Sequence, residues 1–359
     1  GGAESGVDIF GDAYEYLMTM YAANAGKSGG EYFTPPEVSE LLARIVTENG
    51  TKKAPRGEWR CYDPTCGSGG LLLKFLKILE YTGEVTLHGQ EKNVTTYNLC
   101  RVNMLLHGMN WSKLYIRNGD TLVNPDPDLD ERKPFDAIVS NPPYSLKWVG
   151  EDDILMVQDA RFQGPGRLAP KGKADLAFVM HSLRYLADDG IAAIVCFPGV
   201  LYRTGAEAKI REWLVEQGHV DSVIGLPGKL FFGTGITTAI LVLKKGLSDG
   251  KTLFIDASRY FVPSTNSNKL SQENIQGITK ILLERRDVYH VAKLADKDMI
   301  REQEYNLSVS MYVEKEDNSE KINIDALESE ISETVKREDA LRSEIDAIVA
   351  MLRHGQNGS

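Results

Sequence analysis

The chain has 359 residues, of which 42% are hydrophobic and 8% aromatic, a composition that suits a full α/β domain with additions. No apolar run approaches the roughly 18 residues that a membrane span needs, and no secretory leader opens the chain, so we expect a cytoplasmic protein without membrane contact. The formal net charge of −10 argues against a protein that grips nucleic acid by itself, because phosphate neutralisation calls for a basic face.

The cysteines indicate no metal site. Cys61, Cys66, Cys100 and Cys196 lack the paired spacing of metal ligands and lie in or beside apolar segments. Buried, reduced thiols are therefore predicted.

The first predicted element is a lead-in helix over residues 8–26, where apolar side chains recur at helical spacing. The chain opens on Gly-Gly-Ala rather than methionine, and we expect a further N-terminal region before it. A glycine-rich loop at 26–30 lacks Walker spacing, so a flexible connection is favoured over a phosphate site. The next stretch is Glu31-Tyr32-Phe33-Thr34-Pro35-Pro36. Its threonine can cap a helix that a proline opens and that runs to about residue 47.

A strand end, a glycine turn and a helix start are predicted within residues 59–81. The turn reads Cys61-Tyr62-Asp63-Pro64-Thr65-Cys66-Gly67-Ser68-Gly69-Gly70. Its glycines allow close approach of a ligand, and the N-terminus of the following helix favours a carboxylate. Because the spacing is not the G-x-G-x-x-G of dinucleotide-binding folds, we interpret the turn as a site for S-adenosylmethionine.

Two acidic residues follow the next predicted strands. Glu91 ends the strand 85–90, where a carboxylate can accept both hydroxyls of a ribose; a plain surface carboxylate is the alternative. Asp120, with Thr121 after it, lies in the turn that closes a short strand beginning at residue 115. It can accept from the amine of a donor adenine, or only cap the turn. His88 is predicted to pack within its strand rather than to act in catalysis.

The residues Asn141-Pro142-Pro143-Tyr144 follow an apolar, partly β-branched run at 135–140. That run predicts a buried strand, which Asn-Pro stops because proline offers no ladder donor. The side-chain carbonyl of Asn141 and the main-chain carbonyl of Pro142 can both accept from one NH2 group, which makes that amine more nucleophilic. Tyr144 offers a ring on which a planar base or amide can stack. A turn that merely ends a strand is the alternative.

The segment from 145 to 172 is glycine-rich and irregular, and it carries Arg161, Arg167 and Lys171. A loop of this length is usually functional or mobile, so we interpret it as a lid over a target base or DNA, with a solvated charged loop as the alternative. Helices at 175–186 and 207–217 and strands at 191–198, 220–226 and 252–256 are predicted beyond it, with another strand within 229–245. Phe231 or Phe232 can wall a target base or simply pack in the core.

The last segment carries apolar residues in two seven-residue series. They are Ile324, Ile331, Glu338, Ile345 and Leu352, and Leu327, Thr334, Leu341 and Ile348. Sustained 3-4 spacing in a highly charged tail predicts a helix that pairs with a partner, with packing against its own domain as the alternative.

The glycine turn at 61–70 followed by Asn-Pro-Pro-Tyr at 141–144 resembles the modification subunits of type I restriction-modification systems, a family of DNA adenine-N6 methyltransferases. Residues 31–36 resemble the "FTP" donor-site motif of such enzymes, and residues 103–108 are also similar to the family. The resemblance runs from Phe10 to the C-terminal helix. It implies a doubly wound α/β fold with a seven-stranded, mostly parallel sheet of the Rossmann-like methyltransferase type, whose last strand is antiparallel, and a C-terminal partner-binding helix.

The resemblance also implies roles for the residues at the matching positions. The catalytic residues are Asn141, Pro142, Pro143 and Tyr144, with Phe231 and Phe232 as candidates for contact with the substrate base. The S-adenosylmethionine site is expected to comprise Glu31, Tyr32, Phe33, Thr34, Asp63, Thr65, Gly67, Ser68, Gly69, Glu91, Asp120 and Thr121.

Expected partners are DNA, a specificity subunit that contacts the C-terminal helix and a second copy of the modification subunit, and a restriction subunit can attach to such a complex. Four regions are expected: a helical lead-in (1–30), a methyltransferase domain (31–256), a C-terminal extension (257–313) and a coiled-coil-like helix (314–359). In the implied reaction, a flipped adenine presents its N6 to Asn141 and Pro142 without a metal. Alternatives are methylation of a protein glutamine or an RNA base amine, and a non-catalytic scaffold.

Overall fold

A computed structural model places most of the chain. The described residues are 16–17, 20, 34–48, 54, 57–79, 84–231, 237–247, 249–265, 267–314 and 324–355. Most of the expected lead-in helix, together with Glu31, Tyr32, Phe33 and Phe232, lies outside them. The chain divides into two compact units, Gly1–Lys315 and Glu316–Ser359.

The first unit is built on one mixed sheet, which has nine strands within the described residues. In spatial order they are β3 (Leu114–Asn118), β2 (Glu84–Glu91), β1 (Glu58–Asp63), β4 (Phe135–Ser140), β5 (Leu186–Cys196), β7 (Ala239–Leu243), β6 (Val220–Gly225), β8 (Thr252–Asp256) and β9 (Ala292–Ala295). The neighbours from β3 to β5 are parallel, whereas β7 runs antiparallel to both β5 and β6.

The expectation of seven strands is wrong. β8 adds to β6 in parallel, and β9 pairs with β8 in antiparallel orientation, so the sheet continues beyond the expected architecture. β9 is only four residues long and has no alternating pattern, so its own residues do not predict it, and its antiparallel pairing with β8 is what makes it a strand. The α/β class, the mostly parallel order and the reversed β7 agree with expectation.

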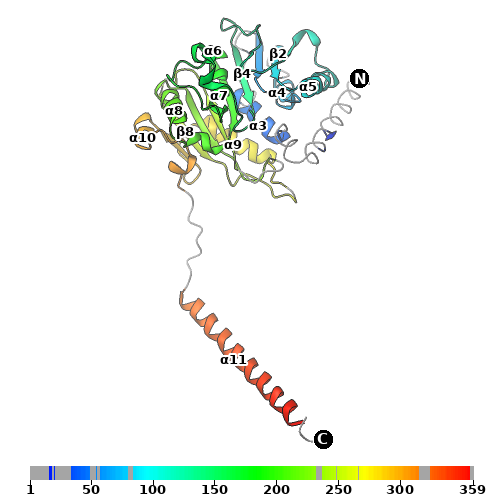
Figure 1. Cartoon of the computed structure of the whole chain (residues 1–359), viewed down its shortest axis with the longest axis vertical. Helices are drawn as coiled ribbons and strands as arrows, with labels where there is room; N and C mark the ends of the chain where they lie inside the picture. Colours follow the sequence, from blue (N-terminus) through cyan, green and yellow to red (C-terminus); the bar gives the residue numbers. More distant parts are fainter. Residues whose placement is uncertain are drawn as a thin grey trace. The chain divides into compact units, whose positions relative to one another are not determined.

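Helices cover both faces of the sheet, as a doubly wound fold requires. One core cluster contains buried residues of α3 (Pro36–Val46), α4 (Gly70–Leu79) and α9 (Gln272–Glu284), and the other contains those of α7 (Asp175–Tyr185) and α8 (Ala206–Glu216) (Figure 1). The remaining helices of this unit within the described ranges are α5 (Val94–Leu106), α6 (Ile154–Gln158), α10 (Lys297–Glu302) and four short 3-10 turns.

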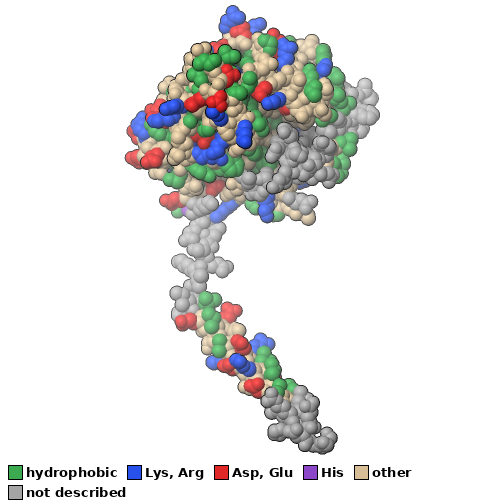
Figure 2. Space-filling view, viewed as in Figure 1, with side chains coloured by type: hydrophobic (Ala, Val, Ile, Leu, Met, Phe, Trp, Pro, Cys, Tyr) green, Lys and Arg blue, Asp and Glu red, His purple; other side chains and the backbone are tan. Residues whose placement is uncertain are grey.

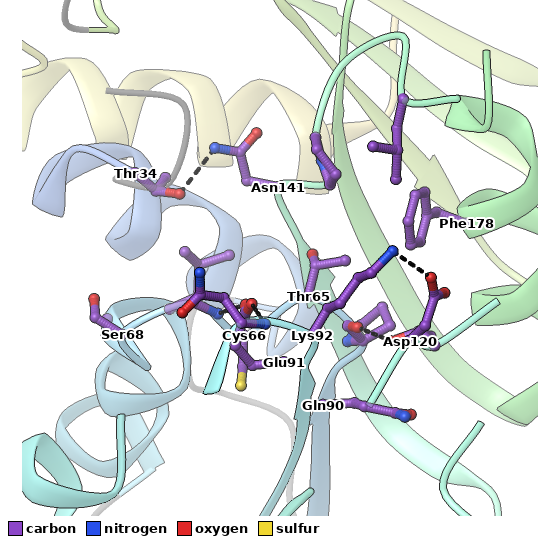
Figure 3. Close-up of a pocket in the computed structure, with 18 of the residues that line it drawn as sticks. Thr34, Thr65, Cys66, Ser68, Gln90, Glu91, Lys92, Asp120, Asn141 and Phe178 are labelled. Carbon is purple, nitrogen blue, oxygen red and sulfur yellow. Dashed lines mark hydrogen bonds and ion pairs between the residues drawn. The ribbon is translucent and has the colours of Figure 1, made fainter. Parts of the chain in front are cut away.

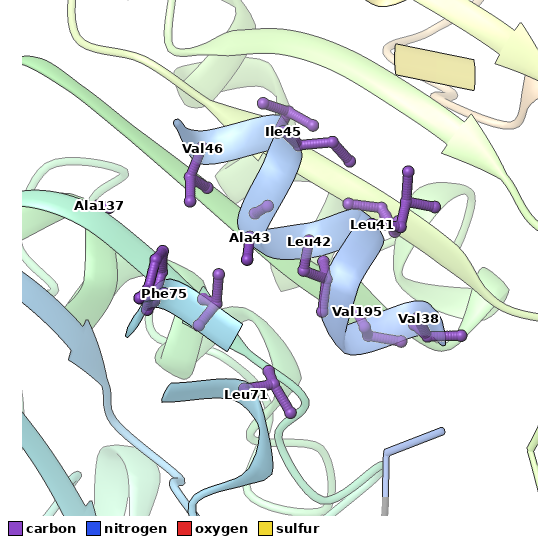
Figure 4. Packing of buried hydrophobic residues seen from close by; sticks show 14 of the residues in the cluster. Val38, Leu41, Leu42, Ala43, Ile45, Val46, Leu71, Phe75, Ala137 and Val195 are labelled. Carbon is purple, nitrogen blue, oxygen red and sulfur yellow. The ribbon is translucent and has the colours of Figure 1, made fainter. Parts of the chain in front are cut away.

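The α3 helix shows how the first cluster is packed. Its apolar residues, among them Leu41 and Leu42, lie over Val195 of β5, and Ala137 of β4 and Phe75 of α4 belong to the same cluster (Figure 4). Pro36 opens the helix, as predicted, but the N-cap is Pro35 and no side chain caps the helix, so the expectation that Thr34 does so is wrong. The Thr34 hydroxyl accepts from Asn141 instead. The helix therefore carries the segment around residue 34 to the edge of the sheet where β4 ends.

Two strands show how well the apolar runs predict their bounds. All six residues of β4 are buried, and it spans the predicted range because proline stops it. β5 starts five residues before the predicted start at 191, since Leu186 pairs with Phe135 across a register shift. Asp188 and Asp189, which lie in this irregular stretch, are exposed and interrupt the apolar run, so the pattern of apolar residues does not predict the start of the strand.

The second unit contains α11 (Ile324–Gly355), a helix of 32 residues. Every side chain described on it, from 327 to 349, is exposed within that unit. Figure 2 shows apolar side chains recurring among charged ones along it. Among the residues that the structure describes, no helix combines the length and apolar character needed to cross a bilayer.

Candidate functional site

A cavity of about 500 Å³ lies where β1, β2 and β4 end. It is lined by Thr34, Ser39, Pro64, Thr65, Cys66, Gly67, Ser68, Gly70, Leu71, Gln90, Glu91, Lys92, Asn93, Asn103, Asp120, Thr121, Asn141, Pro143, Leu146 and Phe178. The carboxyl ends of adjacent parallel strands form the usual ligand-binding edge of an α/β sheet. The glycine turn and Asn141, which are far apart in the sequence, thus face one space (Figure 3).

The glycine turn is held by hydrogen bonds and by close packing. The Thr65 N–H donates to Asp63 Oδ1 at 2.9 Å. Gly67 and Gly69 both have positive φ, and a Cβ on Gly69 would come within 2.5 Å of Met104 Cε. Asp63 is buried, and desolvation raises its pKa to about 7 against the opposing hydrogen bonds from Thr65. The turn is rigid, and Asp63 acts as its internal brace rather than as a cavity wall.

Glu91 links the turn to the end of β2. Its Oε2 accepts from the Gly67 N–H at 3.1 Å and its Oε1 accepts from the Asn93 N–H at 2.7 Å. Burial raises the pKa of this carboxyl, whereas the backbone donors lower it. The predicted ribose acceptor therefore lies in the cavity wall, oriented by two main-chain groups.

Asp120 and Thr121 line the cavity beyond the end of β3. Asp120 Oδ1 accepts from the Leu122 N–H at 3.1 Å, and its Oδ2 pairs with Lys92 Nζ at 2.9 Å. Thr121 Oγ1 donates to the Pro64 carbonyl. The turn that carries Asp120 is therefore joined to the glycine turn.

Within the described part of the chain, Asn141 is held by two side-chain hydroxyls. Its Nδ2 donates to Thr34 Oγ1 at 3.0 Å, and its Oδ1 accepts from the Tyr144 hydroxyl at 2.8 Å (Figure 3 draws the first contact). The Thr65 and Ser140 hydroxyls lie 2.8 Å apart, which ties the glycine turn to the end of β4. Burial raises the pKa of Tyr144, so its hydroxyl stays protonated at neutral pH and can donate.

Several cavity residues were missed by sequence reasoning. Phe178 of α7 and Leu146 supply apolar wall, and Lys92 covers one side as it reaches Asp120. Asn103 of α5 donates from Nδ2 to the Ser68 carbonyl at 2.9 Å, while its buried Oδ1 has no hydrogen-bond partner within the described part of the chain. Gln90 braces the neighbouring loop by donating to the Asn124 carbonyl at 2.8 Å.

Other predicted site residues lie behind the wall. Asp63, Gly69, Pro142 and Tyr144 adjoin it without lining it, and Phe231 is buried in the first core cluster. The predicted packing of His88 is confirmed: its ring stacks on Tyr115 with centroids 4.5 Å apart, and burial lowers its pKa to about 3.

The segment from 145 to 172 is anchored near its two ends, although more than half of its residues, Arg167 and Lys171 among them, are exposed. The Ala174 N–H donates to the Leu146 carbonyl at 2.9 Å, and the Trp148 N–H donates to that of Lys171, also at 2.9 Å. Arg161 is buried, so the alternative of a solvated charged loop is wrong for this residue.

The four cysteines are free and buried, as predicted. In the described residues, no group of three or more His, Cys, Asp and Glu side chains is placed to hold a metal ion.

Comparison with known proteins points to one family. Residues 5–321 match the family described as N-6 DNA Methylase. The chain is 46% identical over 354 residues to the type I restriction enzyme MpnII methylase subunit of Mycoplasma pneumoniae, covering 96% of this chain and 64% of that protein. It is 33% identical to the MjaVIII methylase subunit of Methanocaldococcus jannaschii, covering 92% of this chain and 57% of that one.

A solved structure gives the same result. The crystal structure of the type I restriction-modification methyltransferase subunit from Streptococcus thermophilus superposes with a TM-score of 0.79 and 40% identity, covering 86% of this chain and 64% of that one. The chain therefore spans less than two thirds of the length of these relatives.

Proposed function

Because this chain belongs to the N-6 DNA methylase family, we propose that it transfers a methyl group from S-adenosylmethionine to N6 of an adenine rotated out of DNA. It would act as the modification subunit of a type I restriction-modification complex. The observation that carries this proposal is the shared cavity, in which Asn141 faces the glycine turn and Glu91.

The cavity residues suit S-adenosylmethionine. A volume of about 500 Å³ is in the ordinary range for sites of small ligands and cofactors. Glu91 can accept from ribose hydroxyls, Asp120 from an adenine amine, and the unpartnered Asn103 Oδ1 can accept from the ammonium group of a methionine end. When bound, S-adenosylmethionine supplies a methyl group on positively charged sulfur, which is the electrophile.

The chain's own contribution is to orient the target amine. Asn141 Oδ1 and the Pro142 carbonyl accept from the two N–H groups of N6, which directs the nitrogen lone pair toward the donor side of the cavity. Thr34 engages Asn141 Nδ2, so the side-chain carbonyl is the atom left for the substrate. Either the Tyr144 hydroxyl moves off Asn141 Oδ1 or the second lone pair of that oxygen takes the amine. The Tyr144 ring, which adjoins the cavity, would provide the stacking surface once the target base is bound.

Sequence recognition is assigned to a separate specificity subunit. The net charge is −10, and the face of the first unit in Figure 2 mixes basic and acidic side chains instead of gathering the basic ones. The proposed contact is α11, where Leu327, Ile331, Leu341, Ile345 and Ile348 are each at least 48% exposed. Such a stripe of apolar side chains along a helix suits pairing with another helix. A second copy of this chain and a restriction subunit complete the proposed assembly.

The proposal is tested by co-expressing the chain with its specificity subunit and supplying tritium-labelled donor with DNA, RNA or protein. Label in N6-methyladenine of DNA, dependent on the specificity subunit, is the expected result. If label appears instead in protein glutamine or in RNA, that molecule rather than DNA is the substrate. Donor binding without transfer to any of the three would favour a scaffold role.

A further inference from the structure

One buried arginine, Arg161, joins the segment after Asn-Pro-Pro-Tyr to the donor side of the cavity. We propose that Arg161 is a positioning residue that sets affinity for the methyl donor by fixing the turn at Asp120–Leu122. This inference rests on the proposed function and assigns a role to a residue that does not touch the cavity's ligand.

The Arg161 guanidinium uses each of its five N–H groups. Nε donates to both oxygens of Asp159 at 3.0 Å, and Nη2 donates to the same carboxylate at 2.6 Å. Nη1 donates to the Thr121 carbonyl at 3.0 Å, and Nη2 to that of Leu122 at 2.7 Å. The remaining Nη1 hydrogen meets His181 Nδ1 at 2.9 Å. The cation is thus neutralised by its neighbour and directed at two main-chain oxygens of the donor-side turn.

Thr121 connects Arg161 to the wall of the cavity. Its carbonyl is fixed by Arg161, while its hydroxyl donates to Pro64 of the glycine turn. Asp120, the proposed acceptor for the donor adenine, precedes it in the same turn. A displacement of this turn would therefore move two cavity walls at once.

His181 extends the arrangement to β1. Because Arg161 can only donate, His181 Nδ1 must accept, so the ring carries its proton on Nε2, which lies 2.9 Å from the Tyr62 hydroxyl. Desolvation and the nearby guanidinium hold the pKa of His181 well below its usual range. Tyr62 directly precedes Asp63, and Phe178 lies one helical turn before His181 on α7. The guanidinium is thus linked to the turn at Asp120–Leu122 and to His181 of α7 directly, and to β1 through His181.

The chain contains a matched comparison. Asp130 and Arg132 form the same Asp-x-Arg arrangement, with the Arg132 N–H and Nε both donating to Asp130 Oδ1 at 2.9 Å. The Arg132 side chain is 88% exposed, whereas that of Arg161 is 4% exposed. The local turn is the same in both places, so the reach of Arg161 to Thr121 and Leu122 is what distinguishes them.

The test compares Arg161→Lys with Arg132→Lys in the full chain. Lysine keeps the charge but has three donors on one atom, which cannot span Asp159, Thr121 and Leu122 together. We expect Arg161→Lys to weaken S-adenosylmethionine binding at least tenfold by calorimetry, and Arg132→Lys to leave it unchanged. In the assembled enzyme, KM for the donor should rise, while kcat at saturating donor and KM for DNA stay near their original values.

The outcomes separate this inference from the proposed function. A folded Arg161→Lys variant with unchanged donor affinity overturns the inference and leaves the proposed function intact. Failure of the unsubstituted chain to bind the donor overturns both.

If Arg161→Lys does not fold, hydrogen–deuterium exchange of the unsubstituted chain decides. Saturating S-adenosylmethionine should slow exchange at Arg161 and Phe162 as well as at 120–123. Protection confined to 120–123 overturns the inference.

Discussion

In the proposed function, one side of the cavity takes the methyl donor and the other takes the target base, and the two sides anchor their polar side chains by different means. On the donor side, Asp63, Glu91 and Asp120 each accept from main-chain N–H groups of tight turns. On the target side, Asn141 is held by the hydroxyls of Thr34 and Tyr144. A main-chain donor cannot turn away without deforming the fold, whereas a hydroxyl can rotate. The donor site is therefore preorganised, and the target site is arranged to exchange partners.

Replacing Asn141 would test the target side most severely. Asn141→Ala removes the side-chain acceptor for the target amine, and kcat should fall by about 10³-fold, comparable to the loss of one preorganised hydrogen-bonding group in other active sites. Donor affinity should stay close to that of the unsubstituted chain, since Asn141 contacts Thr34 but neither the glycine turn, Glu91 nor Asp120. Single-turnover methylation and calorimetry measure the two quantities. Near-normal turnover would remove Asn141 from catalysis.

Asp63, on the donor side, should make the stability of the fold depend on pH. Because burial raises the pKa of Asp63 to about 7, the folded chain keeps a proton that the unfolded chain releases near pH 4. The stabilisation from this group is complete below about pH 4 and is lost as the pH rises through about 7. Asp63→Asn should remove up to about 4 kcal/mol of that pH dependence. Urea unfolding at a series of pH values measures this dependence. If the free energy of unfolding varies with pH equally in both chains, Asp63 does not have the raised pKa.

A smaller effect is expected from Glu91→Gln. Glu91 binds the Gly67 and Asn93 N–H groups through separate oxygens, and glutamine places an NH2 donor where one of those oxygens stands. One of these N–H groups, and one ribose hydroxyl, would then lose its acceptor. Losing one charge-assisted hydrogen bond should weaken donor binding by about tenfold. Glu84→Gln, at the exposed start of the same strand, is the control and should bind normally. Equal donor affinities in the two variants would contradict the proposal that the ribose binds at Glu91, at the end of β2.

The smallest change sharpens the account of the target side. Tyr144→Phe keeps the ring and releases Asn141 Oδ1, so kcat/KM should change by only a few-fold. Tyr144→Ala should lose about 1–3 kcal/mol of stacking. Steady-state kinetics with both variants separates the hydroxyl from the ring. A larger loss in Tyr144→Phe than expected would mean that the hydroxyl orients Asn141 during turnover.

Sequence reasoning located those features whose signal is local. The glycine turn and Asn-Pro-Pro-Tyr are contiguous motifs at strand ends, and the parallel topology brings Gly67 and Asn141 to one cavity. Phe178 was missed because nine consecutive residues of α7 are buried and periodicity cannot single out one of them. Lys92 was missed because nothing in the sequence indicates that its side chain, which is 70% exposed, reaches Asp120.

Arg161 is the clearest case of information absent from the sequence. Its Asp-x-Arg setting also occurs at 130–132, so the local pattern cannot separate a buried tether from an exposed turn. Its Nη1 and Nη2 atoms donate to Thr121 and Leu122, which lie 40 and 39 residues away in the sequence. β9 is similar, because its formation depends on the open edge of β8 rather than on its own four residues.

The two edge strands of the sheet, β3 and β9, are short and contain charged residues. β3 has five residues and includes Arg117, which pairs with Asp126 and Asp128, and β9 has four and includes Lys293, which pairs with Asp287. Such margins are poor templates for strand addition by a neighbouring molecule, which protects against aggregation through the sheet. Association of this chain is thereby directed to its helical surfaces, where side chains select the partner.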